Sequence, residues 1–152
     1  MRPSHVEVDL AAIEANTKAI AAAVGPAALC AVVKADGYGH GDVPAAEMAL
    51  AGGAQWLAVA LVEEGIRLRD ADIAAPILLL SEPTPDEAAL VVEWNLVPTV
   101  YRQSFVDLLA GLVPPGRTLP VHLKVDTGMH RLGVPPGDAA DYHQRLRESK
   151  NC

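Results

Sequence analysis

Short, continuously apolar runs recur along the chain, separated by longer segments in which apolar and polar residues mix. Runs without alternation are typical of strands that are buried on both faces, as in a parallel sheet. The intervening segments carry helix signals, so the sequence predicts about five strand–helix units spaced roughly 20–27 residues apart. The predicted strands are residues 29–33, 56–60, 76–80, 97–101 and 121–125.

The N-terminal segment predicts a helix preceded by a short strand. Asp9 is the expected N-cap of a helix over residues 10–24, and Gly25–Pro26 would end it. The larger side chains of this helix recur at helical spacing and form one apolar face. Residues 5–8 alternate polar and apolar side chains, which favours a strand. The predicted apolar face comprises Leu10, Ile13, Ile20 and Val24.

Later helices also carry N-terminal signals. Residues 84–87 (TPDE) place Thr at the N-cap, Pro at the first helical position and Glu at the third, which is a capping box. Ser104 is the expected cap of the next helix, with Asp107 three residues further on. Gly137–Asp138 precedes a final helix predicted over residues 139–150.

Parallel strands joined by helices form two main architectures, the open doubly wound sheet and the eight-stranded barrel. A barrel typically needs about 250 residues, so a chain of 152 residues would supply five of its eight strands. In both architectures the functional groups collect at the carboxyl ends of the strands. The sequence shows no linker or second domain.

Composition and charge indicate what fills the core and which partners the protein does not bind. Apolar residues make up 51% of the chain but aromatic residues only 4%, so Ala, Val and Leu must fill the core. A net charge of −7 argues against a nucleic-acid partner or an anionic membrane surface. The N-terminus lacks the apolar segment of a signal peptide. Cys30 and Cys152 have neither metal-site nor disulfide spacing. We therefore expect a cytoplasmic protein.

The stretch LCAVVKADGYGHGD, residues 29–42, places Lys34 at the end of a buried run. Burying an ammonium group is costly unless it is paired or loses its charge. A lysine at this position could form a Schiff base with an aldehyde. It could also extend its amine to solvent ahead of a flexible turn, and spacing alone favours that interpretation. The pattern G-x-G-x-G at residues 37–41 is not a dinucleotide fingerprint.

Three motifs resemble those of one enzyme family. AVVKADGYGHG (31–41) resembles the pyridoxal-phosphate lysine motif of alanine racemases. KVDTGMHRLG (124–133) resembles the segment that ends the fifth barrel strand of that family, and EVDLAAIEANTKAI (7–20) resembles its opening. The resemblance implies an α/β fold, a parallel (β/α) barrel of TIM type with about five of its eight units. Residues 1–152 would be the N-terminal part of the barrel domain, without the family's C-terminal β domain.

The resemblance also implies roles for single residues. Lys34 matches the lysine that holds pyridoxal 5'-phosphate and acts as one of two racemisation bases. Tyr38 matches a tyrosine beside the cofactor, and Arg131 matches an arginine near the cofactor's phenolic oxygen and the substrate carboxylate. Lys124 matches a lysine that many members carry in N-carboxylated form, which orients that arginine. Without the family, Lys124, Asp126 and Arg131 would fit an ordinary ion-pair cluster equally well.

The function implied by the resemblance is interconversion of L- and D-alanine for peptidoglycan synthesis. Family members are homodimers, and the second base is a tyrosine from the second domain that reaches the site across the dimer interface. Neither Tyr101 nor Tyr142 lies in a matching motif, so we expect a truncated chain that is inactive alone. The alternatives are a non-catalytic pyridoxal-phosphate-binding protein of the same fold, a racemase for another amino acid such as serine, or an interaction fragment without a cofactor.

Overall fold

A computed structural model describes residues 4–149 and contains all five predicted strands. The strands form one sheet in which every neighbouring pair is parallel. Each strand is shorter than the apolar run that predicted it, because the outer residues of each run belong to the loops. The strands are β1 (Cys30–Val32), β2 (Trp56–Val59), β3 (Ile77–Leu79), β4 (Val97–Val100) and β5 (His122–Leu123).

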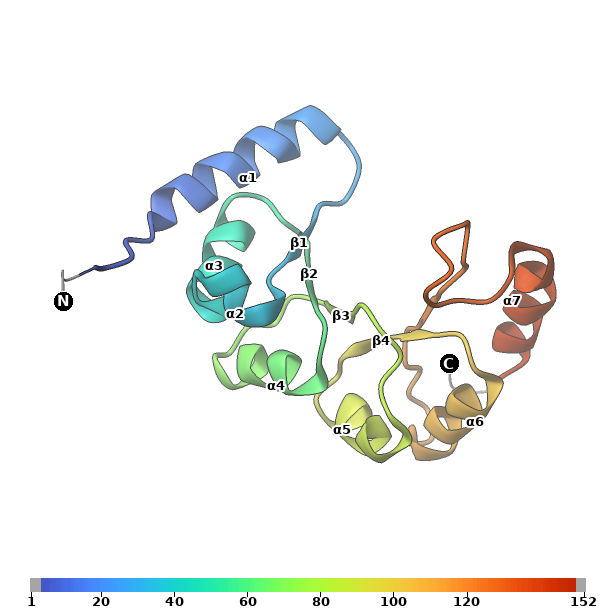
Figure 1. The fold of residues 1–152 in the computed structure, drawn as a ribbon. Coiled ribbons are helices and arrows are strands. Elements are labelled where there is room, and N and C mark those ends of the chain that lie inside the picture. Colours follow the sequence, from blue (N-terminus) through green and yellow to red (C-terminus); the bar gives the residue numbers. More distant parts are fainter. Residues whose placement is uncertain (1–3, 150–152) are drawn as a thin grey trace.

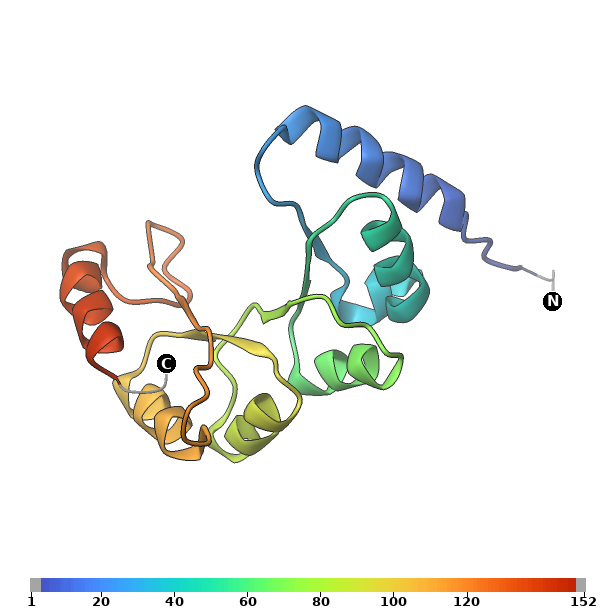
Figure 2. The same cartoon turned by 180° about the vertical axis from the view of Figure 1, so that it is seen from behind.

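Strand order decides between the two architectures. The spatial order β1-β2-β3-β4-β5 follows the sequence without a reversal, whereas a doubly wound sheet reverses its order at a switch point. The helices follow one another around the outside of the sheet, which curves into an arc (Figures 1 and 2). The predicted partial (β/α) barrel is therefore confirmed, with the carboxyl ends of all its strands on one side.

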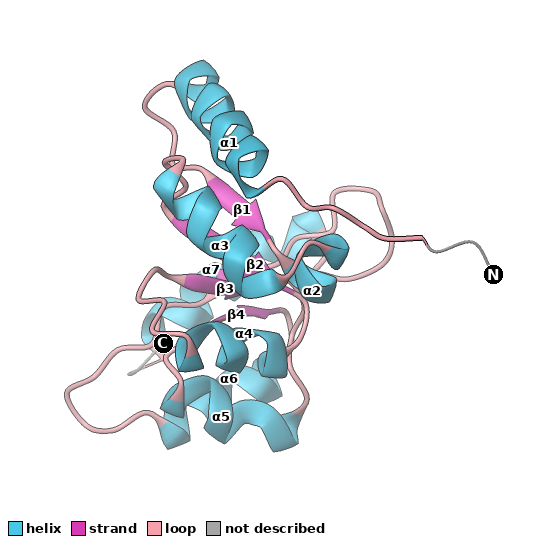
Figure 3. Cartoon of the chain, turned by 90° about the vertical axis from the view of Figure 1, so that its left-hand side faces the viewer, coloured by secondary structure: helices cyan, strands magenta, loops and turns pink. Residues whose placement is uncertain are grey.

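Helices connect successive strands and pack on the outer face of the sheet (Figure 3). No helix among residues 4–149 is long and apolar enough to cross a membrane. The helical segments are α1 (Leu10–Val24), α2 (Lys34–Gly39), α3 (Asp42–Ala51), α4 (Val62–Asp70), η1 (Pro85–Glu87), α5 (Ala88–Glu93), α6 (Gln103–Leu112), η2 (Pro136–Asp138) and α7 (Ala139–Glu148), where η denotes a 3₁₀ turn.

Two of the predicted helix signals act as expected. The Asp9 carboxylate accepts a hydrogen bond from the Ala12 amide at 3.1 Å, and α1 ends at Gly25 with φ of 61°. The capping box before α5 is also confirmed, because the Thr84 amide donates to Glu87 Oε2 at 2.8 Å. The turn that follows Thr84 is the 3₁₀ helix η1, which leads directly into α5.

Two local predictions are wrong. Helix α6 begins at Gln103, so Ser104 lies inside it, and its N-cap is Arg102. The reason is that the Glu82 carboxylate binds the Arg102 amide at 2.9 Å and fixes the chain at the helix entrance. Residues 5–8 form no strand, because the N-terminal tail runs away from the sheet (Figure 1) and Val6 is 87% exposed.

The core lies between the sheet and the outer helices and consists mainly of Val, Leu, Ile and Ala, as the composition predicts. Phe105 is the single aromatic residue among the largest fully buried side chains. Helix α4 packs closely on the chain before β4, because a Cβ atom at Gly65 would lie 2.9 Å from Leu96 Cδ2. Small residues therefore set the distance between the layers.

The predicted apolar face of α1 is only partly covered. Thr17 is the one buried residue among those of α1, whereas Ile20 is 51% and Val24 39% exposed. The helix packs against the end of α3, where a Cβ atom at Gly52 would lie 2.6 Å from Thr17 Cβ. A similar contact follows one turn later, where a Cβ atom at Gly53 would lie 3.4 Å from Ala21 Cβ, so α1 packs on α3 (Figure 1).

The open edges of the sheet lead to a first prediction. Strands β1 and β5 each pair on one side only, and Val32 on β1 is 41% exposed. Unpaired edges with apolar side chains favour association with other chains. We expect the purified chain to self-associate or bind the dye ANS, as measured by size-exclusion chromatography with light scattering. A monomer of 16.0 kDa with a cooperative melt and no ANS signal would contradict this.

A second prediction tests the close packing of α4. Gly65→Ala places a methyl group against the fully buried Leu96, and such overpacking typically lowers the free energy of unfolding by about 1–3 kcal/mol. Gly111→Ala is the matched control, since nothing lies within 4 Å of its Cβ position in α6. Helix propensity should make that control more stable by about 0.5–1 kcal/mol. Urea unfolding of both variants measures the difference, and equal effects would refute the packing argument.

Candidate functional site

Lys34 follows β1 directly, at the carboxyl edge of the sheet. The preceding residue, Val33, still donates to Ala58 O on β2 at 2.9 Å, so the lysine emerges where the ladder ends. Lys34 is partly buried, and its amine lies 5.9 Å from the centre of the Tyr38 ring. Within the described part of the chain no carboxylate forms an ion pair with it. The amine therefore lies next to an aromatic ring with no charged partner.

The turn after Lys34 has an unusual backbone. Residues 35–38 form a left-handed helical turn, with φ between 52° and 60° at all four positions. Gly37 adopts this conformation without cost, but Ala35, Asp36 and Tyr38 each lose about 1–2 kcal/mol. Such strain persists only where the surroundings hold it. These four residues therefore form a regular left-handed turn directly after Lys34.

Hydrogen bonds within the segment hold the turn. The Gly37 amide donates to Val33 O, and the Gly41 amide donates to Asp36 O, both at 2.9 Å. The Asp36 carboxylate accepts the Asp42 amide at 3.1 Å. The His40 ring nitrogen Nδ1 lies 3.0 Å from Gly37 O, so this histidine supports the loop.

Helix α4 contributes an ion pair to the same segment. The Arg67 guanidinium donates to Asp42 Oδ2 at 2.9 Å, and Asp42 is buried. This hydrogen bond is the main reason that the pKa of Arg67 is raised. The other Asp42 oxygen accepts the Val43 amide at 2.8 Å. Asp42 therefore joins the end of the lysine loop to both α3 and α4.

Glu64, in the first turn of α4, connects the ends of β1 and β2. Its residue surface is 5% exposed. One carboxylate oxygen accepts the Ala35 amide at 2.7 Å, and the other accepts the amides of Ala60 and Leu61 at 2.7 and 3.0 Å. Burial alone would raise the pKa of Glu64, but these three donors and nearby Arg67 outweigh it and lower the pKa.

Glu82 makes a similar connection further along the sheet. Its side chain is fully buried, and one oxygen accepts the amides of Tyr101 and Arg102 at 2.6 and 2.9 Å. The other oxygen accepts a hydrogen bond from the Arg102 guanidinium. Sequence reasoning singled out neither Glu82 nor Glu64. The sequence signal that could have identified them is an acidic residue shortly after a buried strand. This signal is not specific, because solvent-exposed carboxylates near helix N-termini often follow strands too.

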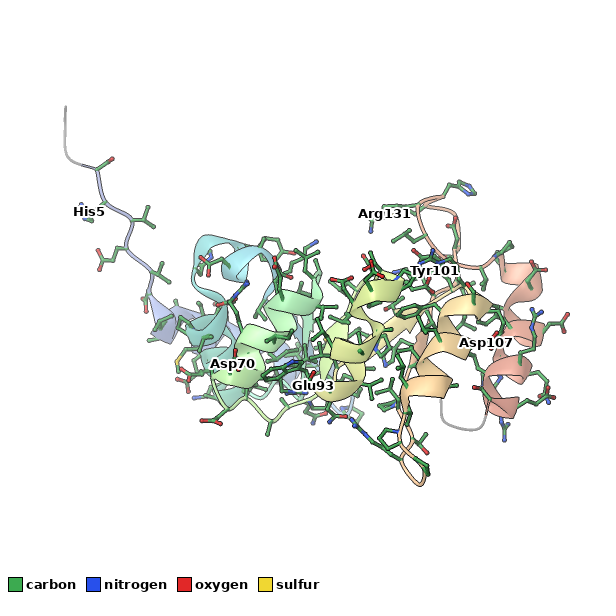
Figure 4. The ribbon with its side chains drawn as sticks, turned by 90° about the horizontal axis from the view of Figure 1, so that it is seen from below. His5, Asp70, Glu93, Tyr101, Asp107 and Arg131 are labelled. Carbon is green, nitrogen blue, oxygen red and sulfur yellow. The ribbon has the colours of Figure 1, made fainter. Side chains whose placement is uncertain are left out.

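The second candidate group surrounds a small cavity of about 190 Å³ after β5, lined by Lys124, Asp126 and Arg131 among others. The Lys124 amide donates to Val100 O on β4 at 3.0 Å. Residues 126–133 form a loop that returns to the strand, where Val134 donates to Lys124 O at 2.9 Å. The Arg131 side chain projects from this loop (Figure 4).

Asp126 organises this loop through its own backbone. One carboxylate oxygen accepts the amides of Gly128 and His130 at 3.0 and 2.9 Å. These donors lower the pKa of Asp126. The other oxygen lies 3.4 Å from His130 Nδ1. In the described structure no ion pair joins Asp126 to Lys124 or Arg131, so the ion-pair cluster that the sequence left open does not form.

The two groups share one edge of the sheet but not one pocket. Lys34 follows β1 and Arg131 follows β5, which are the outer strands. Four strand spacings of about 4.8 Å separate them along the sheet, roughly 19 Å in all. Figure 4 shows Arg131 on the side opposite Asp70 and Glu93, which end helices α4 and α5. Closure of a barrel would bring β1 and β5 to face each other across the same end.

This fold and its lysine define a segment of a (β/α) barrel with candidate chemistry at the carboxyl ends of its strands. Residues 8–152 match the family model described as alanine racemase, N-terminal domain. The chain therefore belongs to the alanine racemase family, which is a family of isomerases, and it matches the N-terminal domain of that family.

Named relatives and solved structures agree with this assignment. The chain is 50% identical to the alanine racemase of Synechocystis over 143 residues, which is 90% of this chain and 38% of the relative. It is 46% identical to that of Symbiobacterium thermophilum, covering 96% of this chain and 39% of the relative. The alanine racemase structure from E. faecalis superposes with a TM-score of 0.87 at 36% identity, over 95% of this chain and 40% of that one.

A further structure is that of alanine racemase from Bacillus anthracis with bound L-Ala-P. It superposes with a TM-score of 0.83 at 34% identity and covers 97% of this chain and 39% of that chain. The present chain thus spans about two fifths of the length of these relatives.

A third prediction concerns the loop that carries Arg131. Because the folded-state pKa of Asp126 lies below its ordinary value of 3.8, the loop gains stability above that value and loses it as the pH falls through the lowered pKa. The amide NMR signals of Gly128 and His130 should therefore titrate with a midpoint below 3.8. Asp126→Asn is the control, since it removes this titration. A midpoint at or above the ordinary value would show that the amides do not hold the carboxylate.

Proposed function

We propose that this chain is the N-terminal part of the barrel domain of a pyridoxal-phosphate-dependent alanine racemase, acting in the cytoplasm on L- and D-alanine for peptidoglycan synthesis. The observation that carries the proposal is Lys34, which lies at the carboxyl end of β1 without an ion-pair partner in the described structure. The family assignment supports it. The L-Ala-P bound to the Bacillus anthracis relative supports alanine as the substrate.

The residues around Lys34 fit the cofactor. A lysine amine without a carboxylate partner can react with an aldehyde, because no ion pair has to be broken first. Tyr38, with its ring 5.9 Å from the amine, is 60% exposed and available to a ligand. When bound, pyridoxal phosphate supplies an electron sink for the negative charge that develops on the substrate Cα.

The chain's own groups then have distinct tasks. The Lys34 amine removes or returns the Cα proton on one face of the substrate. The Arg131 guanidinium can bind the substrate carboxylate or the cofactor's phenolic oxygen through its paired N–H donors. Lys124 lines the same cavity as Arg131, and N-carboxylation would give it a negative charge that orients the arginine.

Racemisation also needs an acid–base group on the opposite face. Tyr142 is unsuitable, because burial raises its pKa to about 12 and it is 5% exposed. Tyr38 lies beside Lys34 itself. As the family resemblance implies, we propose that the second base comes from a C-terminal β domain of a partner subunit in a homodimer. On this basis the chain alone should show no racemase activity above background.

A fourth prediction tests Lys34 directly. Incubation with pyridoxal 5'-phosphate followed by borohydride should leave a stable adduct on Lys34, located by peptide mass spectrometry. Lys34→Ala should abolish that adduct. Lys18→Ala is the matched control, since Lys18 lies on α1 and pairs with Glu14. An adduct found mainly on Lys18, Lys124 or Lys150 would refute the assignment.

A further inference from the structure

We propose that Glu64 is a positioning residue for Lys34, because its carboxylate fixes the backbone immediately after the lysine to the adjacent strand. This inference rests on the proposed function, in which Lys34 holds the cofactor. Among the described residues no ion pair joins Glu64 to the lysine amine. Its effect is transmitted through the Ala35 amide, which it binds at 2.7 Å.

The two carboxylate oxygens of Glu64 bind the ends of two different strands. Oε1 accepts the Ala35 amide, which belongs to the peptide that joins Ala35 to Lys34. Oε2 accepts the amides of Ala60 and Leu61, which follow β2. A rigid carboxylate that binds both sets of donors fixes the end of β1 relative to the end of β2. The lysine side chain leaves the backbone at that fixed point.

Backbone strain explains why this contact matters. Ala35, Asp36 and Tyr38 all have φ between 52° and 56°, and each is less stable there than in a right-handed conformation. The Glu64 bond is the contact from another element to the first residue of this turn. Arg67, one helical turn later on α4, binds Asp42 just after it. Helix α4 therefore holds both ends of the strained segment.

The arrangement of donors makes glutamine a sharp probe. Gln in place of Glu64 keeps the shape but replaces one acceptor oxygen with an NH₂ donor. That donor must face either the Ala35 amide or the Ala60 and Leu61 amides. Either orientation turns a donor toward a donor and removes at least one of these partly buried hydrogen bonds, and hydrogen bonds to charged groups are among the stronger ones. Glu63→Gln is the matched control, since Glu63 is the exposed neighbour in the same turn.

The experiment combines amide exchange with labelling of the lysine. In Glu64→Gln, hydrogen exchange at Ala35 should become about 10- to 100-fold faster, while the core amides of Leu79 and Val100 keep their protection. Labelling of Lys34 by pyridoxal 5'-phosphate and borohydride should fall severalfold relative to Lys18 in the same molecule. Glu63→Gln should match the unmodified chain in both measurements.

A second variant covers the case in which Glu64→Gln unfolds the chain and the core amides lose protection. Glu64→Asp keeps the charge but is one methylene shorter, so it can reach the nearby Ala60 and Leu61 amides but not Ala35 as well. Exchange at Ala35 should again accelerate and labelling of Lys34 should again fall, with the core intact.

The outcomes separate the two proposals. If the unmodified chain labels Lys34 preferentially and both Glu64 variants label it equally well, Glu64 has no positioning role and the function proposal stands. The same conclusion holds if exchange at Ala35 does not change. If the unmodified chain shows no preference for Lys34 over Lys18, the proposed function fails, and the role of Glu64 in it fails as well.

Discussion

The arrangement of the candidate site depends on carboxylates that accept backbone N–H groups at the carboxyl ends of the strands, and those of Glu64 and Glu82 are buried. Glu64 joins the ends of β1 and β2, Glu82 binds the chain after β4, and Asp126 binds the loop after β5. A carboxylate withdrawn from water is unfavourable without compensation. Two or three N–H donors supply that compensation, and the same bonds fix loops that would otherwise be free to move.

These contacts make each strand end dependent on a neighbouring unit of the fold. The turn after Lys34 is held from α4, and the start of α6 is held by Glu82, which follows β3. Functional loops in barrels must be precise although they lie outside the regular elements. Here the precision comes from hydrogen bonds within each loop, such as those accepted by Asp36 and Asp126, together with side chains of the next unit, such as Glu64.

The sequence was sufficient to predict all five strands, the helices between them and the placement of Lys34 at a strand end, because these depend on local periodicity and local signals. It failed where partners distant in the sequence decide the outcome. Ser104 is a reasonable cap by its local sequence, but Glu82 binds the amide of Arg102 two residues earlier, and the importance of Glu64 depends on an amide 29 residues away. The left-handed turn was also unexpected, because only one of its four residues is glycine.

The groups that hold the turn after Lys34 lie close together along the chain, and this has a consequence for folding during protein synthesis. The hydrogen bonds described above that hold residues 35–42 all join groups between Val33 and Arg67. Domains and their parts fold progressively as the chain leaves the ribosome, N-terminal segments first. The groups that make these hydrogen bonds have therefore all been synthesised once α4 ends at Asp70, before the later strands are added.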